Sequence, residues 1–133
     1  MAQLYGMHQL ELRPGVTPQA FERFVVEELS RLRPRPGQRT YVLKGDRGER
    51  AGKYVFVFEY DSVASRDRDT PGSNQDSEEL VAWLQEHHAE VGALFERLST
   101  FVLPDWDIGQ HYTDYVVVEA DDARAGDRGR SRA

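Results

Sequence analysis

The stretch KYVFVFEY at residues 53–60 decides the fold. Two valines and a glutamate alternate there with a row of aromatic side chains, Tyr54, Phe56, Phe58 and Tyr60. A period of two residues is typical of a strand, because successive side chains point to opposite faces of a sheet. Both sets contain bulky apolar groups, so the sequence predicts a central strand that is covered on both faces.

Three more strands are predicted around this one. Residues 38–44 precede it, and the glycine-containing turn region 45–50 between them indicates an antiparallel hairpin. Residues 4–12 alternate in the same way and form the expected first strand. Residues 111–119 contain a run of valines and form the expected last strand.

Two helices are expected between these strands. Thr17 and Pro18 form a typical helix start, and apolar residues follow at helical spacing until Leu32. A capping-box pattern precedes a second, longer helix over residues 78–98. The polar segment 61–75 is expected to be a loop, or a loop with a short helical turn near Ser65.

The resulting β-α-β-β-α-β order predicts an α+β, ferredoxin-like fold with a four-stranded antiparallel sheet and two helices on one face. The two helices can cover only one face of such a sheet, whereas the strands carry apolar residues on both. We therefore expect a partner on the open face, and a second copy of the chain is the simplest one. The expected assembly is a homodimer.

Composition limits the possible classes of protein. The chain has 133 residues, of which 39% are hydrophobic and 30% charged, which predicts one soluble globular domain. We expect this domain to span residues 1–119 and to be followed by a disordered tail, residues 120–133, which has no large apolar residue. No apolar stretch is long enough to span a bilayer, and the first residues lack a signal-peptide pattern. The expected location is cytoplasmic, without a membrane partner.

Several chemistries are disfavoured at this level. The chain has no cysteine, which excludes disulfides, thiolate nucleophiles and cysteine-containing zinc sites. Its four histidines lack the spacing of known metal motifs, so we predict no metal site. A net charge of −6 disfavours nucleic-acid binding, which depends on a positive surface that releases counterions.

Residues 10–15, LELRPG, continue into residues 17–24, TPQAFERF. Together with the order of elements, this segment resembles the dimeric α/β-barrel superfamily, which includes small cofactor-independent monooxygenases and haem-degrading oxygenases. The resemblance covers residues 4–119. It implies a homodimer whose sheets face each other, with a ligand pocket in each protomer between the sheet and the helices.

The resemblance does not favour haem. Haem-degrading relatives have an asparagine in the first strand, which is absent here, and a wider spacing between a tryptophan and a ligating histidine than that between Trp83 and His87. No cofactor is predicted, with haem as a disfavoured alternative. Cofactor-independent oxygenation of a phenol or quinol needs only an apolar pocket with a few polar groups, since the substrate supplies the electrons.

The candidate catalytic residues are His87 and His88 on the second long helix. At 100° per residue, His87 lies near the centre of the apolar sector of that helix and His88 near its edge. An imidazole in an apolar cleft can bind a ligand or transfer a proton. The alternative, which we favour for either histidine alone, is a partly buried structural residue that is hydrogen-bonded to the backbone or a carboxylate.

Five further residues are candidates for ligand binding. His8, on the first strand, is a second polar contact, and Trp83 forms an apolar wall. Tyr54 and Phe58 could line the pocket by stacking, although an aromatic row of this kind is more often core or dimer packing. Trp106 could close the pocket, dock on the partner chain or seal the end of the core.

These observations predict a dimeric α/β-barrel protein that binds a small apolar or aromatic molecule. Two classes of function remain open. One is a monooxygenase-like enzyme, and the other is a noncatalytic dimerisation or ligand-sensing module in which the same histidines are structural.

Overall fold

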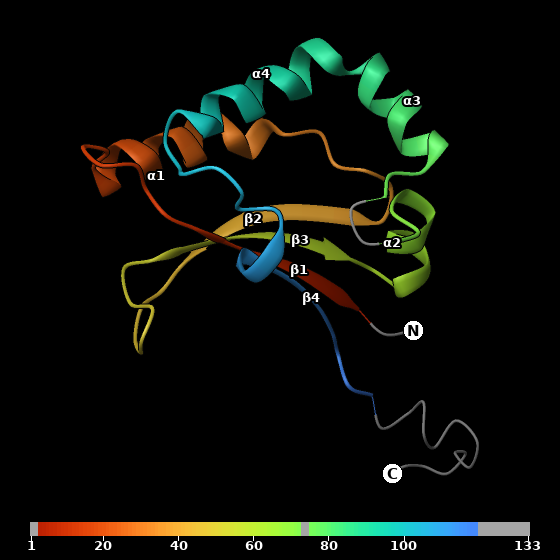
Figure 1. The fold of residues 1–133 in the computed structure, drawn as a ribbon, viewed down its shortest axis with the longest axis horizontal. Helices are drawn as coiled ribbons and strands as arrows, with labels where there is room; N and C mark the ends of the chain where they lie inside the picture. The colour runs from red at the N-terminus through yellow and green to blue at the C-terminus, as the bar shows by residue number, and fades with distance from the viewer. Residues whose placement is uncertain (1–2, 73–74, 120–133) are drawn as a thin grey trace.

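The computed structural model describes residues 3–72 and 75–119. The predicted tail, residues 120–133, lies outside the described residues. Four strands form one sheet, namely β1 (Leu4–Leu10), β2 (Gln38–Lys44), β3 (Tyr54–Tyr60) and β4 (Tyr112–Val116). The α-helices are α1 (Pro18–Glu27), α2 (Val63–Asp69), α3 (Glu78–Glu86) and α4 (His88–Ser99), and Leu29–Arg31 and Gly109–His111 are short 3₁₀ turns (Figure 1).

The sheet has the strand order β2-β3-β1-β4. Each neighbouring pair is antiparallel, and β3 and β1 are the two central strands. The predicted α+β class, the four-stranded antiparallel sheet and the central position of residues 54–60 are confirmed. The arrangement is compatible with a ferredoxin-like fold.

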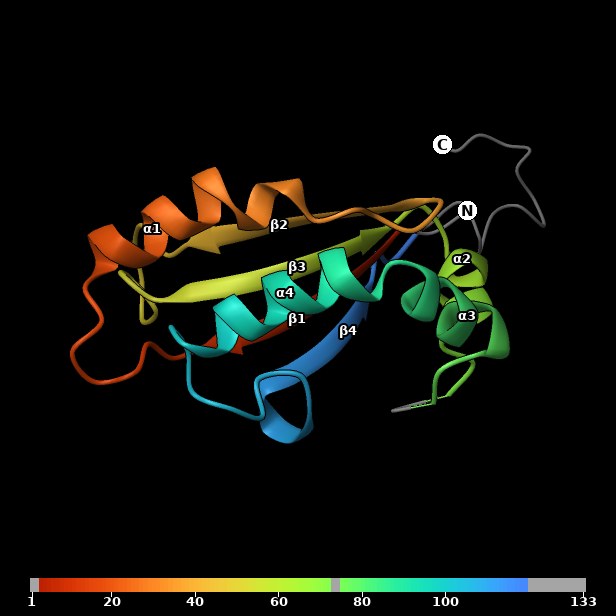
Figure 2. The same ribbon diagram turned by 90° about the horizontal axis from the view of Figure 1, so that it is seen from above.

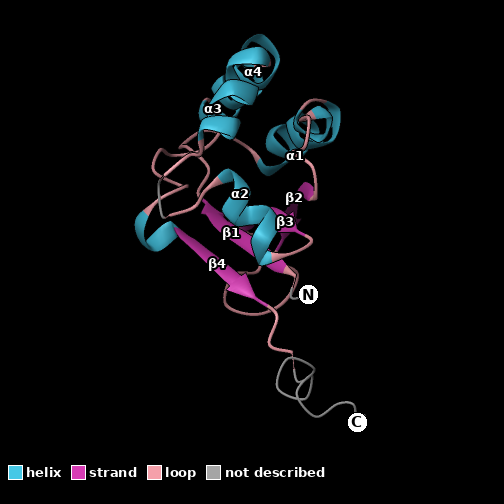
Figure 3. Ribbon diagram, turned by 90° about the vertical axis from the view of Figure 1, so that its right-hand side faces the viewer, coloured by secondary structure: helices cyan, strands magenta, loops and turns pink. Residues whose placement is uncertain are grey.

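Helices α1, α3 and α4 all lie on the same side of the sheet (Figures 1 and 3). Seen from above, α1 runs along β2, α4 crosses the central strands, and α2 and α3 lie beyond one end of them (Figure 2). Within residues 3–72 and 75–119, no helix covers the opposite face of the sheet. None of the described helices is long and apolar enough to cross a bilayer.

The core lies between α1, α4 and the central strands. The Thr17 side chain caps α1 by accepting a hydrogen bond from the backbone N–H of Ala20, and Pro18 occupies the first turn, as the sequence predicts. The helix thereby directs Phe21 and Phe24 onto the sheet, where both are buried. The largest fully buried side chains are those of Phe21, Phe24, Phe56, Leu4, Leu10, Leu98, Val57, Val102 and Asp69.

The prediction of one continuous helix over residues 78–98 is wrong. The helix breaks at His87, whose backbone angles (φ −106°, ψ 20°) end α3 before α4 starts. The His87 Nδ1 lies 3.0 Å from the Trp83 carbonyl oxygen, and its ring stacks on the Trp83 indole. The backbone N–H of His87 still donates to the Trp83 carbonyl oxygen at 3.0 Å, so the break is a local change of backbone angles, which hydrophobic periodicity does not report.

Three smaller boundaries also differ. Helix α1 ends at Glu27 and gives way to a 3₁₀ turn instead of continuing to Leu32. Segment 61–75 contains the seven-residue helix α2, which the Ser62 side chain caps. This helix has few apolar residues, so hydrophobic periodicity does not predict it. Strand β4 covers Tyr112–Val116 and is therefore shorter than the predicted 111–119.

Candidate functional site

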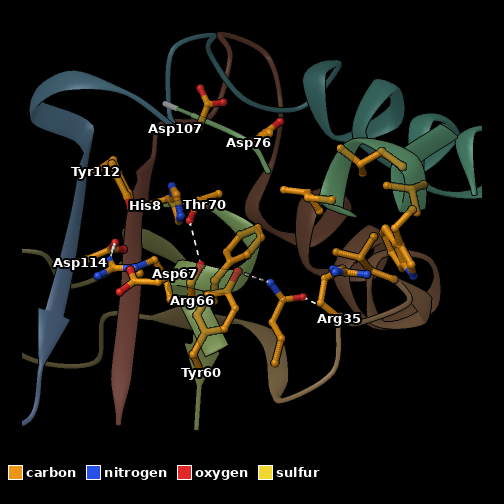
Figure 4. Close-up of a pocket in the computed structure, with 18 of the residues that line it drawn as sticks. His8, Arg35, Tyr60, Arg66, Asp67, Thr70, Asp76, Asp107, Tyr112 and Asp114 are labelled. Atoms are coloured by element: carbon orange, nitrogen blue, oxygen red, sulfur yellow. Dashed lines mark hydrogen bonds and ion pairs between the residues drawn. The ribbon is translucent and has the colours of Figure 1, made fainter. Parts of the chain in front are cut away.

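A cavity of about 740 Å³ lies between the sheet and the helices, at the end of the sheet where α2 and α3 stand (Figure 4). Its floor comes from β1, β3 and β4, and its walls come from α2, α3, α4 and the segment before β4. Aromatic rings supply much of the lining, and they belong to His8, Phe58, Tyr60, Trp83, Phe95, Trp106 and Tyr112. The volume is within the range typical of small-molecule sites.

His8 lies at the centre of an aromatic cluster on the floor. Its imidazole stacks on the Tyr112 ring, with centroids 4.6 Å apart, and lies 4.9 Å from Phe58 and 5.4 Å from Trp106. The residue is only 8% exposed, and its Nδ1 is buried without a hydrogen-bond partner. This nitrogen has no accessible surface, so it does not face the open part of the cavity.

The surroundings keep this imidazole neutral. Burial lowers the pKa of His8, and the nearby charges of Asp114 and Asp107 and the backbone of Trp106 oppose that effect only in part. Because the ordinary pKa of histidine is about 6.5, a lowered value leaves the ring uncharged at neutral pH. A neutral imidazole can accept a proton or exchange hydrogen bonds with a bound molecule.

Gly6 lies beside His8 on the floor. It lies between Phe58 of β3 and Asp114 of β4 in the strand register. A Cβ atom at this glycine would lie 3.0 Å from Asp114 Oδ1 and 3.6 Å from His8 Nε2. A side chain at this position would therefore be tight against the carboxylate, and glycine lets Asp114 and His8 approach the strand closely.

Arg66 of α2 holds the Asp114 carboxylate in place. Its guanidinium pairs with Asp114 Oδ2 and also with Asp67, in a partly buried position (Figure 4). Burial and the charge of Asp114 raise the pKa of the Tyr112 hydroxyl, so that this hydroxyl stays protonated. This end of the cavity thus combines one fixed carboxylate, one neutral imidazole and one phenol.

The other end of the cavity contains a buried ion pair. Arg35, which is 7% exposed, donates from Nε and Nη2 to Asp69 Oδ1 at 3.2 and 2.7 Å. Its guanidinium also lies 5.1 Å from the centre of the Trp83 ring. Gln38 links this end to the middle of the cavity by donating to the Tyr60 hydroxyl at 2.8 Å (Figure 4).

The structure brings four of the predicted site residues together. His8, Phe58, Trp83 and Trp106 all line the cavity. Tyr54 does not, because it is packed in the core, where its hydroxyl donates to Glu22 and where burial and that carboxylate raise its pKa to about 12. The alternative of core packing therefore describes Tyr54, whereas Phe58 lines the pocket.

Neither candidate catalytic histidine lines the cavity. His87 is half-buried and stacks on Trp83, and His88 is exposed on α4 next to Gly92. The His87 Nδ1 lies 3.0 Å from the Trp83 carbonyl oxygen, which agrees with the alternative of a structural histidine bonded to the backbone. A catalytic role for these two histidines has no geometric support at this cavity and stays a prediction.

Sequence reasoning missed Tyr112, Asp114, Arg66 and Arg35. Tyr112 and Asp114 share one face of β4, but only the β1–β4 register puts them beside His8 and Gly6. Arg35 and Arg66 belong to polar segments, and the sequence of such a segment does not indicate whether it lines a cavity or forms a solvent-exposed loop. Among the described residues, no group of three or more histidine, aspartate or glutamate side chains is arranged to hold a metal ion.

Comparisons with protein-family models, with curated proteins and with solved structures found no match to this chain. The resemblance to the dimeric α/β-barrel superfamily therefore stays a prediction.

Proposed function

We propose that this chain binds a small aromatic molecule in the cavity between the sheet and helices α3 and α4, as a homodimeric α/β-barrel protein. The observation that carries the proposal is the position of His8. It is a neutral imidazole that lines a cavity together with six aromatic side chains, those of Phe58, Tyr60, Trp83, Phe95, Trp106 and Tyr112. Apolar walls with a few polar groups are typical of sites for flat organic ligands.

The aromatic lining favours a flat ligand. Phe58 and Tyr112 contact His8 from two sides, and Trp106 lies within stacking range of Phe95, with centroids 6.2 Å apart. Offset and edge-to-face contacts between rings contribute about 0.5–1.5 kcal/mol each beyond the burial of apolar area. An aromatic ligand would add such contacts to rings that already border open space.

The neutral His8 supports a second candidate, cofactor-independent oxygenation. An imidazole with a lowered pKa can take the proton of a substrate hydroxyl at neutral pH, which leaves an electron-rich phenolate and an imidazolium. With O₂ as the oxidant, one quinol and one O₂ would give one hydroxyquinone and one water. The substrate supplies the electrons in this reaction, as the resemblance to cofactor-independent monooxygenases implies.

The open face of the sheet supports the homodimer. It carries a shallow apolar hollow on the side away from the helices, lined by Tyr5, Met7, Tyr41, Leu43, Val57 and Tyr115. Leu43 and Tyr115 are 47% and 57% exposed in the single chain. A contiguous apolar patch on a sheet is stabilised when it is covered, and a second copy of the same face is complementary by two-fold symmetry.

Ligand binding is tested by calorimetric titration with a panel of phenols, quinols and haem. We expect micromolar to millimolar binding of two-ring phenols, and loss of at least tenfold in affinity for Trp106→Leu. The matched control is Leu103→Ala, an exposed apolar residue close in sequence that does not line the cavity. Binding that is the same in both variants, or absent for every probe, would contradict the proposal.

Catalysis is tested separately by oxygen consumption with a quinol. An enzyme would consume O₂ above the rate of the uncatalysed reaction and would lose that excess in His8→Gln. A protein that binds the quinol but leaves the rate of O₂ consumption unchanged is a ligand-sensing or dimerisation module. That outcome keeps the binding proposal and rejects the oxygenase.

The dimer is tested by sedimentation equilibrium of the full chain. The expected mass is about twice the 15.2 kDa of one chain. Leu43→Arg should give a monomer, because it places a charge in the apolar hollow. Val26→Arg is the control, since Val26 is 71% exposed on α1, on the other side of the sheet. A monomeric wild-type chain would contradict the homodimer.

A further inference from the structure

We infer that the Tyr60 hydroxyl is a hydrogen-bond donor to the ligand of the cavity, and that it selects ligands with an uncharged carbonyl oxygen, such as aromatic ketones and quinones. This inference rests on the proposed function, because it assigns a chemical class to the ligand of the same cavity. It is carried by a chain of hydrogen bonds through Arg35, Gln38 and Tyr60, in which the donor and the acceptor of each bond can be assigned.

The chain of hydrogen bonds starts at a backbone group. The backbone N–H of Arg35 donates to the side-chain Oε1 of Gln38 at 3.0 Å. A backbone N–H can only donate, so the atom of Gln38 that faces it must be the amide oxygen and not the amide nitrogen. This contact fixes the orientation of an amide group whose two ends have nearly the same shape.

The orientation of Gln38 decides the role of Tyr60. With Oε1 on Arg35, the Gln38 Nε2 faces Tyr60 and donates to its hydroxyl oxygen at 2.8 Å (Figure 4). The hydroxyl oxygen is the acceptor in this contact, so its own proton is left to be donated elsewhere. Within residues 3–72 and 75–119, no acceptor forms a hydrogen bond with that proton.

The position of Tyr60 makes this proton available to a ligand. Tyr60 and Gln38 both line the cavity, and the Tyr60 ring extends from the end of β3 toward the middle of the lining side chains (Figure 4). Tyr60 is only 8% exposed, so it is nearly shielded from solvent. A buried donor without an acceptor costs free energy, and a ligand oxygen in the cavity would relieve this cost.

The hydroxyl keeps its proton at neutral pH. Burial and the charge of Asp69 raise the pKa of Tyr60 above its ordinary value, and the hydrogen bond from Gln38 and the charge of Arg35 oppose this in part. Even the ordinary pKa of tyrosine, about 10, leaves the hydroxyl protonated at neutral pH. Tyr60 is therefore a donor in the conditions in which a ligand binds.

The donor is held in place before a ligand arrives. Gln38 and Tyr60 face each other in the β2–β3 register. The Gln38 backbone N–H donates to the Arg35 carbonyl oxygen at 2.9 Å, which closes a four-residue turn with Pro36 and Gly37 at its middle. Gly37 has a φ of 78°, which suits the third residue of a type II turn. Proline and glycine thus place Gln38 where it meets both of its partners.

The charges around the cavity favour an uncharged acceptor. Among the described residues, the charged side chains of the lining are four aspartates and three arginines, namely Asp67, Asp76, Asp107, Asp114, Arg33, Arg35 and Arg66. Each of these arginines is already paired with a carboxylate. A carboxylate ligand would therefore meet a surplus of negative charge, whereas a ketone oxygen accepts the hydrogen bond from Tyr60 without this repulsion.

The test uses 1-indanone and indane, two probes with the same fused rings that differ in one carbonyl oxygen. The readout is the pair of tryptophan indole N–H signals in a two-dimensional ¹H–¹⁵N spectrum of the full chain. The chain has two tryptophans, Trp83 and Trp106, and both line the cavity. The shifts of both signals during a titration therefore give the affinity for each probe.

Tyr60→Phe removes the hydroxyl and keeps the ring. We expect this variant to bind 1-indanone about fivefold more weakly than the wild-type chain, the factor typical of one hydrogen bond between uncharged groups. Its affinity for indane should change by less than about twofold. The comparison of the two probes cancels any general effect of the substitution on the cavity, because such an effect acts on both probes.

Gln38→Glu tests the direction of the hydrogen bonds and keeps the shape of the side chain. A carboxylate at this position still accepts from the Arg35 backbone, but it cannot donate to Tyr60 and accepts the Tyr60 proton instead. This variant should therefore also weaken the binding of 1-indanone relative to indane by about fivefold. A purely structural role of Gln38 would affect both probes equally.

Tyr41→Phe is the matched control. This variant also loses a tyrosine hydroxyl of the sheet, one that donates to Glu59 at 2.8 Å. Tyr41 lines the apolar hollow on the other face of the sheet and not the cavity. The ratio of the affinities for 1-indanone and indane should therefore stay at its wild-type value.

Two measurements on the wild-type chain keep the inference testable if the variants at Tyr60 and Gln38 do not fold. The infrared C=O stretching band of bound 1-indanone should lie at a lower wavenumber than in an apolar solvent, because a hydrogen bond weakens the C=O bond. Indane-1-carboxylate, which carries its oxygens as an anion, should bind more weakly than 1-indanone.

Four results would overturn the inference and leave the proposed aromatic binding intact. They are an equal effect of Tyr60→Phe or of Gln38→Glu on both probes, a loss of the same size in Tyr41→Phe, a C=O band at its position in an apolar solvent, and tighter binding of indane-1-carboxylate than of 1-indanone. No shift of either indole signal with any probe would overturn the proposed function and the role of Tyr60 together.

Discussion

The helix-covered face of the sheet has two ends that differ in how they are filled. Beneath α1, Phe21 lies 4.8 Å from Tyr54 and Phe24 lies 4.8 Å from Phe101, measured between ring centroids, and these rings pack in the hydrophobic core. At the end near α2 and α3, Phe58 and Tyr60 of the same β3 row line a cavity of about 740 Å³.

The difference comes from the helices and not from the strand. The aromatic row of β3 continues with the same spacing from one end to the other. Helix α1 and the last turns of α4 pack against the first half, whereas the helix breaks at His87 and α3 lies beyond the other end of the strands (Figure 2). The end beneath α1, which we call the filled end, therefore supplies stability. The end beside α2 and α3, which we call the hollow end, leaves room for a ligand in the cavity.

The largest expected effect tests the filled end. Phe21→Ala should reduce the free energy of unfolding by about 3–5 kcal/mol, because it removes a fully buried ring and leaves a cavity in a packed region. Urea denaturation followed by circular dichroism measures this loss. A loss below about 1.5 kcal/mol would mean that this end is not the source of stability.

The second largest effect is expected for the buried ion pair between Arg35 and Asp69, at the edge of the hollow end. Asp69→Ala should cost about 3 kcal/mol, because it leaves the buried Arg35 guanidinium without its main partner. Asp67→Ala is the control on the same helix, and its exposed pairing with Arg66 should be worth less than about 1 kcal/mol. Urea denaturation measures the loss of unfolding free energy in both variants. Similar losses would show that the buried Arg35–Asp69 pair contributes no more to stability than the pair between Arg66 and Asp67.

A smaller effect is expected for an aromatic residue of the hollow end. Phe58→Ala should cost about 1–2 kcal/mol, well below Phe21→Ala, since part of the Phe58 ring already borders open space and removing it loses fewer contacts. Thermal and urea unfolding of both variants under one buffer condition provide the comparison. Equal losses would remove the distinction between the two ends.

The smallest effect is the pH dependence that His8 contributes. Its pKa is lowered in the folded chain, so the unfolded chain binds the proton more readily, and stability falls as the pH drops below the ordinary histidine value of about 6.5. His8→Gln should therefore show a flatter stability profile between pH 7 and pH 5. Parallel profiles for wild type and variant would contradict a neutral, buried imidazole.

The filled end was largely predictable from the sequence. Alternation in residues 54–60 identified the central strand, and Thr17 with Pro18 identified the start of α1, because these signals are local. The same alternation could not separate Tyr54, which is packed in the core, from Phe58, which lines the cavity. A period of two residues reports which face a side chain occupies and not what covers that face.

The hollow end depended on information that is not local. His8 was identified as a candidate for a ligand contact, but Asp114 and Arg66 lie near it only through strand register and the packing of α2. The prediction of an unbroken helix across His87 was wrong, and neither His87 nor His88 lines the cavity.

The most direct test of the account is a crystal structure of the full chain grown with 1-naphthol. The account predicts electron density for the naphthol ring in the cavity, in contact with Phe58 and Trp106. A cavity filled instead by Trp83 or Trp106, or a naphthol bound elsewhere on the chain, would contradict it.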